Sequence, residues 1–363
     1  MKGRLLLFVL ALFICLCAIP AQAGDDVYTA TFVVGDGTVS TLSVADGSVA
    51  LPEAPAESVG FCGWQGTLHG ENVFLPAGAT CTGISEDVTF QAVFVDFKTD
   101  TGCSVRLLEE QVALRFTSTI ALDDYEALAV AVGGKDKIGF GTYIVPSYYV
   151  TNAGGVFTLE ALAANGMHKY IDVEAGAFYK KTETTATVAG SVKNILKGNY
   201  TLVYTGIGYM KITYTDGSVG TVYAEYNQKR NSHSILKTVL GAYNDRDDSY
   251  GNLVTENDVN THSPYTDTEL SLMRDFLDKV VLVGHNLKYE YFVLPTEHYV
   301  SPWTITYVGD EYGRTKIYAA PPAGMTASDV MGIYLDGLVI ALKNSSVEEG
   351  QVVFVHDSYV SVG

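Results

Sequence analysis

The stretch that decides the fold class is YMKITYTDGSVGTVYAEY, residues 209–226. On both sides of Asp216-Gly217, apolar and aromatic residues alternate with polar ones, which is the pattern of two half-buried strands. Asp-Gly between two such runs is the strongest short-range signal for a β-hairpin. The sequence therefore predicts a hairpin in the middle of the chain.

The same alternation recurs on both sides of this hairpin, with a few short helical patterns between the strands. Strands are expected at residues 112–120, 138–146, 289–294, 304–308, 315–319, 333–342 and 351–355. Helices are expected at residues 122–128, 157–162, 234–243 and 266–280, where apolar residues follow a helical spacing or acidic residues favour a helix start. We therefore expect a mainly β fold with a few short helices, in the α+β class.

The N-terminal residues 1–23 have the pattern of a cleavable secretory signal peptide. Lys2 and Arg4 precede an apolar run over residues 5–19, and the A-x-A motif at residues 21–23 is a cleavage site. The run is shorter than the roughly twenty residues that a helix needs to cross a bilayer. An uncleaved anchor and a lipoprotein are the alternatives. No later stretch is long and apolar enough to span a membrane, so we expect a secreted protein, at the cell surface or free.

The chain is strongly acidic, with 23 Lys and Arg against 41 Asp and Glu and a formal net charge of −18. Without residues 1–23, which hold two basic and no acidic residues, the net charge becomes −20. Such a surface repels phosphate, which argues against nucleic acid and anionic membranes as partners. The 24 Tyr suit contacts with proteins or sugars, or simply fill half-buried positions in sheets.

After signal removal the chain keeps three cysteines, Cys62, Cys81 and Cys103. A disulfide between Cys62 and Cys81 is the expected pairing because both lie in one candidate module, which would leave Cys103 free. The alternative is that all three are reduced. No C-x-x-C motif or His pair accompanies them, so the sequence gives no reason to expect a zinc site.

The first module is expected over residues 27–95. It opens with the strand YTATFVV at 28–34, continues through GFCGW at 60–64, and closes with the strand VTFQAVF at 88–94. This series resembles the Listeria–Bacteroides repeat, the internalin-type B-repeat of bacterial surface proteins. The resemblance implies a β-grasp-like module that acts as a spacer or interaction module, with Trp64 in its core. The chain departs from the family in having Phe94 at the final Trp position and in its two extra cysteines.

A linker rich in Thr, Asp and Gly is expected at residues 96–103, followed by two β-sandwich-like modules at 104–283 and 284–363. The first of these carries RFTSTI at 115–120, FGTYIVP at 140–146 and GYMKITYTDGS at 208–218. That series resembles a module of secreted clostridial proteins without an established activity. The resemblance implies an extracellular β-rich module and nothing more.

One polar loop has oxygen-bearing side chains at a spacing similar to that of a calcium-binding EF-hand loop. Its candidate ligands, at loop positions one, three, five and twelve, are Asp245, Asp247, Ser249 and Glu256. The Gly that an EF-hand requires at position six is replaced by Tyr250, so the loop cannot make the same sharp bend. A solvated acidic loop is the alternative.

No metalloprotease helix, P-loop, nucleophile elbow or dinucleotide fingerprint is present in the sequence. We therefore expect an extracellular binding or interaction protein without catalytic activity, with a protein or glycan at the cell surface as its partner. A secreted hydrolase acting on glycans or cell wall is one alternative, and it would need a cleft with paired carboxylates. A structural spacer or assembly subunit is the other.

Overall fold

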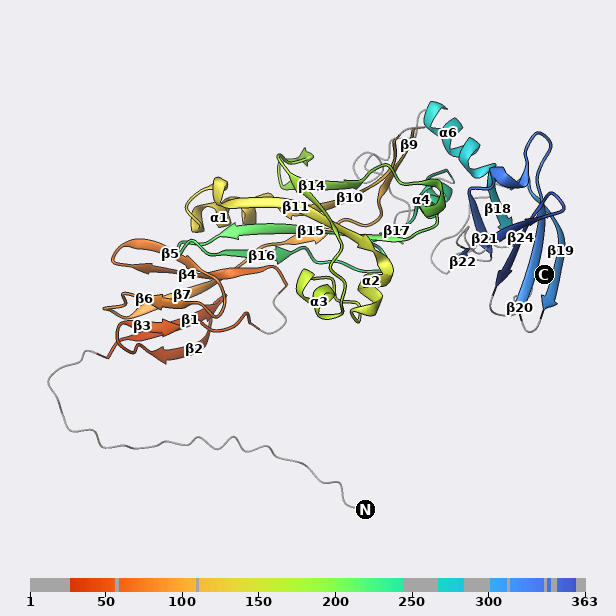
Figure 1. Ribbon diagram of the computed structural model, residues 1–363. Helices are drawn as coiled ribbons and strands as arrows, with labels where there is room; N and C mark the ends of the chain where they lie inside the picture. The colour runs from red at the N-terminus through yellow and green to blue at the C-terminus, as the bar shows by residue number, and fades with distance from the viewer. Residues whose placement is uncertain are drawn as a thin grey trace, which may run out of the picture.

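The computed structural model describes residues 27–55, 59–108, 111–243, 267–283, 301–311, 314–335, 338–340 and 345–356. The fold is mainly β with a few short helices, as the alternating sequence predicted, and the strands form several sheets (Figure 1). Among the described residues, none of the helices has the length and apolar character needed to cross a membrane.

The first module is built on a five-stranded mixed sheet with the order β2-β1-β7-β4-β5. Its strands are β1 (Thr29–Val34), β2 (Gly37–Ser43), β4 (Phe61–Leu68), β5 (Glu71–Leu75) and β7 (Val88–Phe94). The first and last strands, β1 and β7, run parallel in the centre, and their neighbours are antiparallel. A separate two-stranded ribbon pairs β3 (Ser48–Ala50) with β6 (Thr80–Thr82).

Trp64 lies at the centre of the core of this module and is fully buried. Its ring meets Phe32 edge-on at a centroid distance of 5.2 Å, and Phe32 in turn stacks on Phe90 at 5.3 Å. The indole N–H donates to the carbonyl of Pro52 at 3.0 Å, which satisfies the polar end of the buried ring. The alternation of β1 and β7 puts these apolar side chains on one face of the sheet.

Two sheets packed face to face form the middle of the chain. We call them the β10 sheet, with the order β13-β14-β10-β8 and β9 paired further along β10, and the β15 sheet, with the order β12-β11-β15-β16 and β17 paired with β15. The strands are β8 (Phe97–Thr99), β9 (Ser104–Leu108), β10 (Gln111–Ala121), β11 (Ile138–Pro146), β12 (Ile171–Ala175), β13 (Lys180–Lys181), β14 (Thr185–Val192), β15 (Tyr204–Thr213), β16 (Val219–Tyr223) and β17 (Ser232–His233). The helices are α1 (Leu122–Ala131), α2 (Ser147–Asn152), α3 (Leu159–Ala164) and α4 (Ile235–Tyr243).

Glycines on the facing strands let the two sheets approach closely. A Cβ added at Gly206 of β15 would lie 2.3 Å from Cγ of Phe116 on β10. A Cβ added at Gly190 of β14 would lie 2.3 Å from Cβ of Thr142 on β11. Such distances are well inside van der Waals contact, so the sequence fixes the packing of the sandwich by leaving side chains out at these positions.

The segment 96–103, which the sequence predicts as a linker, contributes a strand to the sandwich. β8 pairs antiparallel with β10, and Phe97 is 1% exposed. The Phe97 ring meets Phe140 of the opposite sheet at 6.0 Å. Burial of this aromatic ring explains why a stretch rich in turn-forming residues is nevertheless ordered as part of a sheet.

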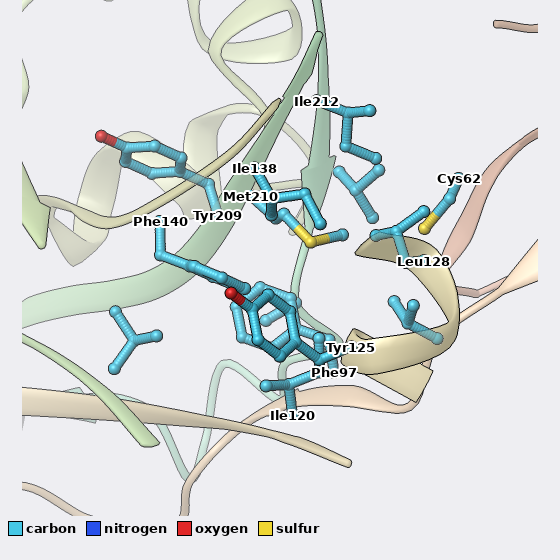
Figure 2. Packing of buried hydrophobic residues seen from close by; sticks show 14 of the residues in the cluster. Cys62, Phe97, Ile120, Tyr125, Leu128, Ile138, Phe140, Tyr209, Met210 and Ile212 are labelled. Carbon is cyan, nitrogen blue, oxygen red and sulfur yellow. The ribbon is translucent and has the colours of Figure 1, made fainter. Parts of the chain in front are cut away.

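The first module is docked on the turn of the β15–β16 hairpin. The Tyr214 hydroxyl donates to the carbonyl of Cys62 at 2.8 Å, and the Tyr214 ring stacks on Phe74 at 5.5 Å. Next to it, the backbone N–H of Thr215 donates to the carbonyl of Phe74 at 3.0 Å. Figure 2 shows Cys62 beside Leu128, at the side of the main hydrophobic cluster that also contains Met210. The first module and the sandwich therefore share one hydrophobic cluster, in addition to the cluster that the module forms around Trp64.

The C-terminal part follows helix α6 (Asp267–Leu277) and holds two further sheets. One has the order β18-β21-β22, from β18 (Val280–Val283), β21 (Gly332–Leu335) and β22 (Leu338–Ile340). The other has the order β19-β20-β24-β23, from β19 (Thr304–Glu311), β20 (Arg314–Ala320), β24 (Gln351–His356) and β23 (Ser345–Glu348). Buried side chains of both sheets, among them Val281, Ile317 and Phe354, form one cluster.

Two sequence expectations differ from the structure in this part. Residues 280–283, assigned to the middle module, form β18, which pairs in parallel with β21 of the C-terminal part. The single strand expected at 333–342 is instead the two strands β21 and β22, which pair antiparallel. The strand expected at 289–294 lies outside the described residues.

Candidate binding cleft

A cleft of about 490 Å³ lies between the first module and the β15 sheet. The first module supplies Gly60 and Phe61, and the loop between α2 and α3 supplies residues 155–158. The third wall is residues 221–226, which include the end of β16, the strand of the β15 sheet on the side of the first module (Figure 1). The cleft therefore exists only because the first module is docked on the sandwich.

Aromatic side chains fix the loop wall of the cleft. Phe157 is 1% exposed, and its ring meets Tyr226 edge-on at 6.0 Å. The Tyr226 hydroxyl donates a hydrogen bond to the carbonyl of Gly155. Burial raises the pKa of Tyr226, so the hydroxyl keeps its proton and remains a donor at neutral pH.

Tyr223 ties β16 to the start of α3. Its hydroxyl accepts from the backbone N–H of Leu159 at 3.0 Å and donates to Oε2 of Glu160 at 3.2 Å. Burial is the main cause that raises the pKa of Tyr223, with the nearby Glu160 carboxylate adding to it. The side chain of Thr158 caps the same helix by accepting from the N–H of Ala161 at 3.1 Å. Side-chain hydrogen bonds from Tyr223 and from Thr158 therefore hold the start of α3 at this wall of the cleft.

A cluster of tyrosines lies on the same sheet, next to the cleft. Tyr143 stacks on Tyr209 at 4.1 Å, and the Tyr209 hydroxyl donates to Asp172 at 2.6 Å. Burial, followed by the Asp172 carboxylate, raises the pKa of Tyr143 to about 12. Tyr143 is only 3% exposed and Tyr209 only 1%. These two tyrosine rings are therefore packing residues of the sheet, the alternative considered above for the high tyrosine content.

The predicted disulfide is absent, because Cys62 and Cys81 are free thiols in two different clusters. Cys62 lies in the core that the first module shares with the sandwich, whereas Cys81 lies in the module's own core around Trp64. Cys103 is buried elsewhere, with its Sγ 3.1 Å from Oγ1 of Thr238. Position within one module was therefore a poor guide to pairing, since the two thiols belong to different cores.

The candidate calcium ligands Asp245, Asp247, Ser249 and Glu256 lie outside the described residues. Within the part of the chain that the structure describes, no three His, Cys, Asp or Glu side chains come together in a way that could hold a metal ion.

Sequence reasoning did not identify the cleft. In the sequence, Phe61 falls in the repeat-like centre, Phe157 at the start of an expected helix, and Tyr223 in a strand of the expected hairpin. Nothing in the sequence pointed to the cleft, because its walls come from three segments that are far apart in the chain. No known protein-family model matches the sequence, and no curated protein matches it.

Proposed function

We propose that this chain is an extracellular binding protein, secreted or held at the cell surface, that takes part of a protein or glycan into the cleft between its first module and the β15 sheet. The observation that carries this proposal is the composition of the cleft. Aromatic rings and backbone form its walls, and a few polar groups such as Thr158 and Thr221 lie among them. Concave sites of this kind, with apolar walls and few polar groups, are typical of ligand sites.

Two features of the sequence support the extracellular part of the proposal. Residues 1–23 have the charge, apolar run and cleavage motif of a signal peptide. The first module resembles the Listeria–Bacteroides repeat of surface proteins, and its buried Trp64 and closing strand β7 suit that relationship. We propose that the module belongs to this group of interaction modules.

The docking of the first module favours a binding role over that of a spacer. A spacer repeat needs only its own core, whereas this module shares a core with the sandwich through Cys62 and Phe74. A hydrolase would need a second carboxylate near the bond to be cleaved. Among the described residues that line the cleft, Glu225 is the only acidic one, so the cleft as described is better suited to holding a ligand than to cleaving it.

A binding screen with a cleft-blocking variant tests the proposal. The chain from residue 24 onward is applied to a glycan array and to a displayed library of random 12-residue peptides, and hits are measured by calorimetry. Thr221→Arg fills the cleft from an exposed position, and it should abolish binding. Val347→Arg is the control, because Val347 is 57% exposed on β23 of the C-terminal part and is not among the residues that line the cleft. Absence of any ligand, or equal loss in both variants, would refute the cleft as the binding site.

A further inference from the structure

β16 is the edge strand of its sheet, and only one of its edges is paired within the sheet. Its partner is β15, in antiparallel register from Thr213↔Val219 to Tyr209↔Tyr223. Two backbone hydrogen bonds mark the register at either end: Tyr214 N–H to the carbonyl of Ser218, and Ala224 N–H to the carbonyl of Gly208, each at 2.9 Å. In an antiparallel pair every second residue forms such bonds.

This alternation identifies the backbone N–H and C=O groups of β16 that do not bond to β15. Residues 218, 220, 222 and 224 point their N–H and C=O groups toward β15, so Val219, Thr221 and Tyr223 point theirs away from it. Thr221 and Tyr223 line the cleft. Within the described residues, no strand pairs with β16 on this second side, so the cleft contains a stretch of unpaired strand edge.

The chain itself pairs with this edge at Glu225, near the end of the cleft wall formed by residues 221–226. The N–H of Glu225 donates to the carbonyl of Phe97 at 2.8 Å, and the N–H of Thr99 donates to the carbonyl of Glu225 at 2.7 Å. Strand β8 thus pairs at Glu225 and then leaves the edge, because Asp96 bonds instead to Ala121 and to the side chain of Asp124. The edge is therefore competent for strand pairing, and the part of it at Thr221 and Tyr223 stays open because β8 has left it there.

We infer that the occupant of the cleft is an extended polypeptide segment of a partner protein, which adds to β16 as a further strand. This inference rests on the proposed function and names the class of ligand. Outward N–H and C=O groups recur every second residue, about 7 Å apart, and another extended backbone matches that repeat. The edge residues Val219, Thr221 and Tyr223 include no Lys or Pro, the residues that commonly protect exposed edges. The half-buried Phe61 on the wall from the first module favours an apolar side chain on the peptide.

The test uses a peptide selected from the random 12-residue library and the chain from residue 24 onward. Thr221→Pro removes one outward N–H while leaving the bonds to β15 intact, since Pro is tolerated on the open side of an edge strand. Thr221→Ala keeps the N–H, so it measures what loss of the Thr221 side chain alone does to binding. We expect Thr221→Pro to bind the peptide at least tenfold more weakly than Thr221→Ala. If the Thr221→Pro protein does not fold, the test uses the wild-type chain and peptides that are N-methylated at one backbone amide at a time. The affinity of the peptide should then fall when every second amide is methylated.

The other outcomes separate this inference from the proposed function. A peptide that binds without a two-residue period, or equally well to Thr221→Pro, overturns strand addition and leaves the binding function in place. Binding of glycans alone, blocked by Thr221→Arg, overturns the polypeptide occupant. A dimer that Thr221→Pro dissolves would show that a second copy of this chain fills the edge instead of a partner. If neither library gives a ligand, the proposed function itself fails.

Discussion

Removal of the Tyr214 side chain should undock the first module from the sandwich. Tyr214 is 7% exposed at the end of β15, and its ring lies against Phe74 of β5 with the planes 24° apart. Its hydroxyl donates to the Cys62 carbonyl, a hydrogen bond between buried atoms. The side chain therefore contributes to the shared core both by burial of its ring and by satisfying a carbonyl that has lost access to water.

The two contributions have different magnitudes and can be separated by two variants. Tyr214→Phe keeps the ring and leaves the buried carbonyl without its donor, which costs about 1–3 kcal/mol. Tyr214→Ala also removes the ring and leaves a cavity, for which large aromatic to Ala changes cost about 3–5 kcal/mol. We expect the Ala variant to lose the larger amount and to lose binding in the cleft as well, because Gly60 and Phe61 move with the first module.

Urea unfolding followed by tryptophan fluorescence measures both effects. Trp64 reports on the first module and Trp303 on the C-terminal part, so a Trp303→Phe background isolates the first signal. If the first module is docked on the sandwich, the urea midpoint reported by Trp64 fluorescence should be highest in wild type, lower in Tyr214→Phe and lowest in Tyr214→Ala. A Trp64 midpoint that is unchanged in Tyr214→Ala would refute the shared core, since the module would then owe no stability to the sandwich.

Three further predictions follow from the interior of the sandwich. Gly206→Ala should cost about 1–3 kcal/mol because its Cβ would lie 2.3 Å from Phe116, whereas Gly176→Ala, with no atom within 4 Å, should be nearly neutral in the same denaturant titration. Burial lowers the pKa of His233 to about 3. Since unfolded His titrates near 6.5, the stability that neutral His233 provides is complete above that pH and is lost as pH falls toward 3, by up to about 1.4 kcal/mol per pH unit. His233→Gln should therefore lose stability less steeply than wild type over this range, and parallel curves would contradict the prediction. Burial raises the pKa of the Cys103 thiol to about 12, and Cys62, Cys81 and Cys103 are all buried and free. In the chain from residue 24 onward, a thiol reagent at pH 8 should consequently label almost none of them before unfolding and three per chain after it. A single labelled thiol after unfolding would indicate a disulfide.

Local pattern in the sequence predicted several of the strands. The strand at 138–146 coincides with β11, and the hairpin around Asp216-Gly217 is β15 and β16. Helices α4 and α6 also lie where apolar spacing indicated. These elements could be predicted because turn chemistry and side-chain period are properties of neighbouring residues.

Long-range pairing could not be predicted in this way. β18 and β21 pair in parallel across about fifty residues, and nothing in either strand specifies the other. β8 is three residues long and becomes a strand only because Phe97 finds a buried position against β10 and β11. β21 and β22 pair antiparallel where one strand was expected over 333–342, because an apolar run does not by itself show where a chain folds back.

The cleft depends on the same hairpin that decides the fold. Tyr214 and Thr215, at its turn, hold the first module in place, and β16, its second strand, supplies the edge that the cleft exposes. Docking and binding are therefore coupled through one short stretch of chain. A ligand strand on β16 that also contacts Phe61 must stabilise the docked arrangement, because a ligand that binds one state shifts the equilibrium toward it. Ligand should thus raise the Trp64 unfolding midpoint in Tyr214→Phe as well as in wild type, and a ligand that raises neither would not be bridging the two walls.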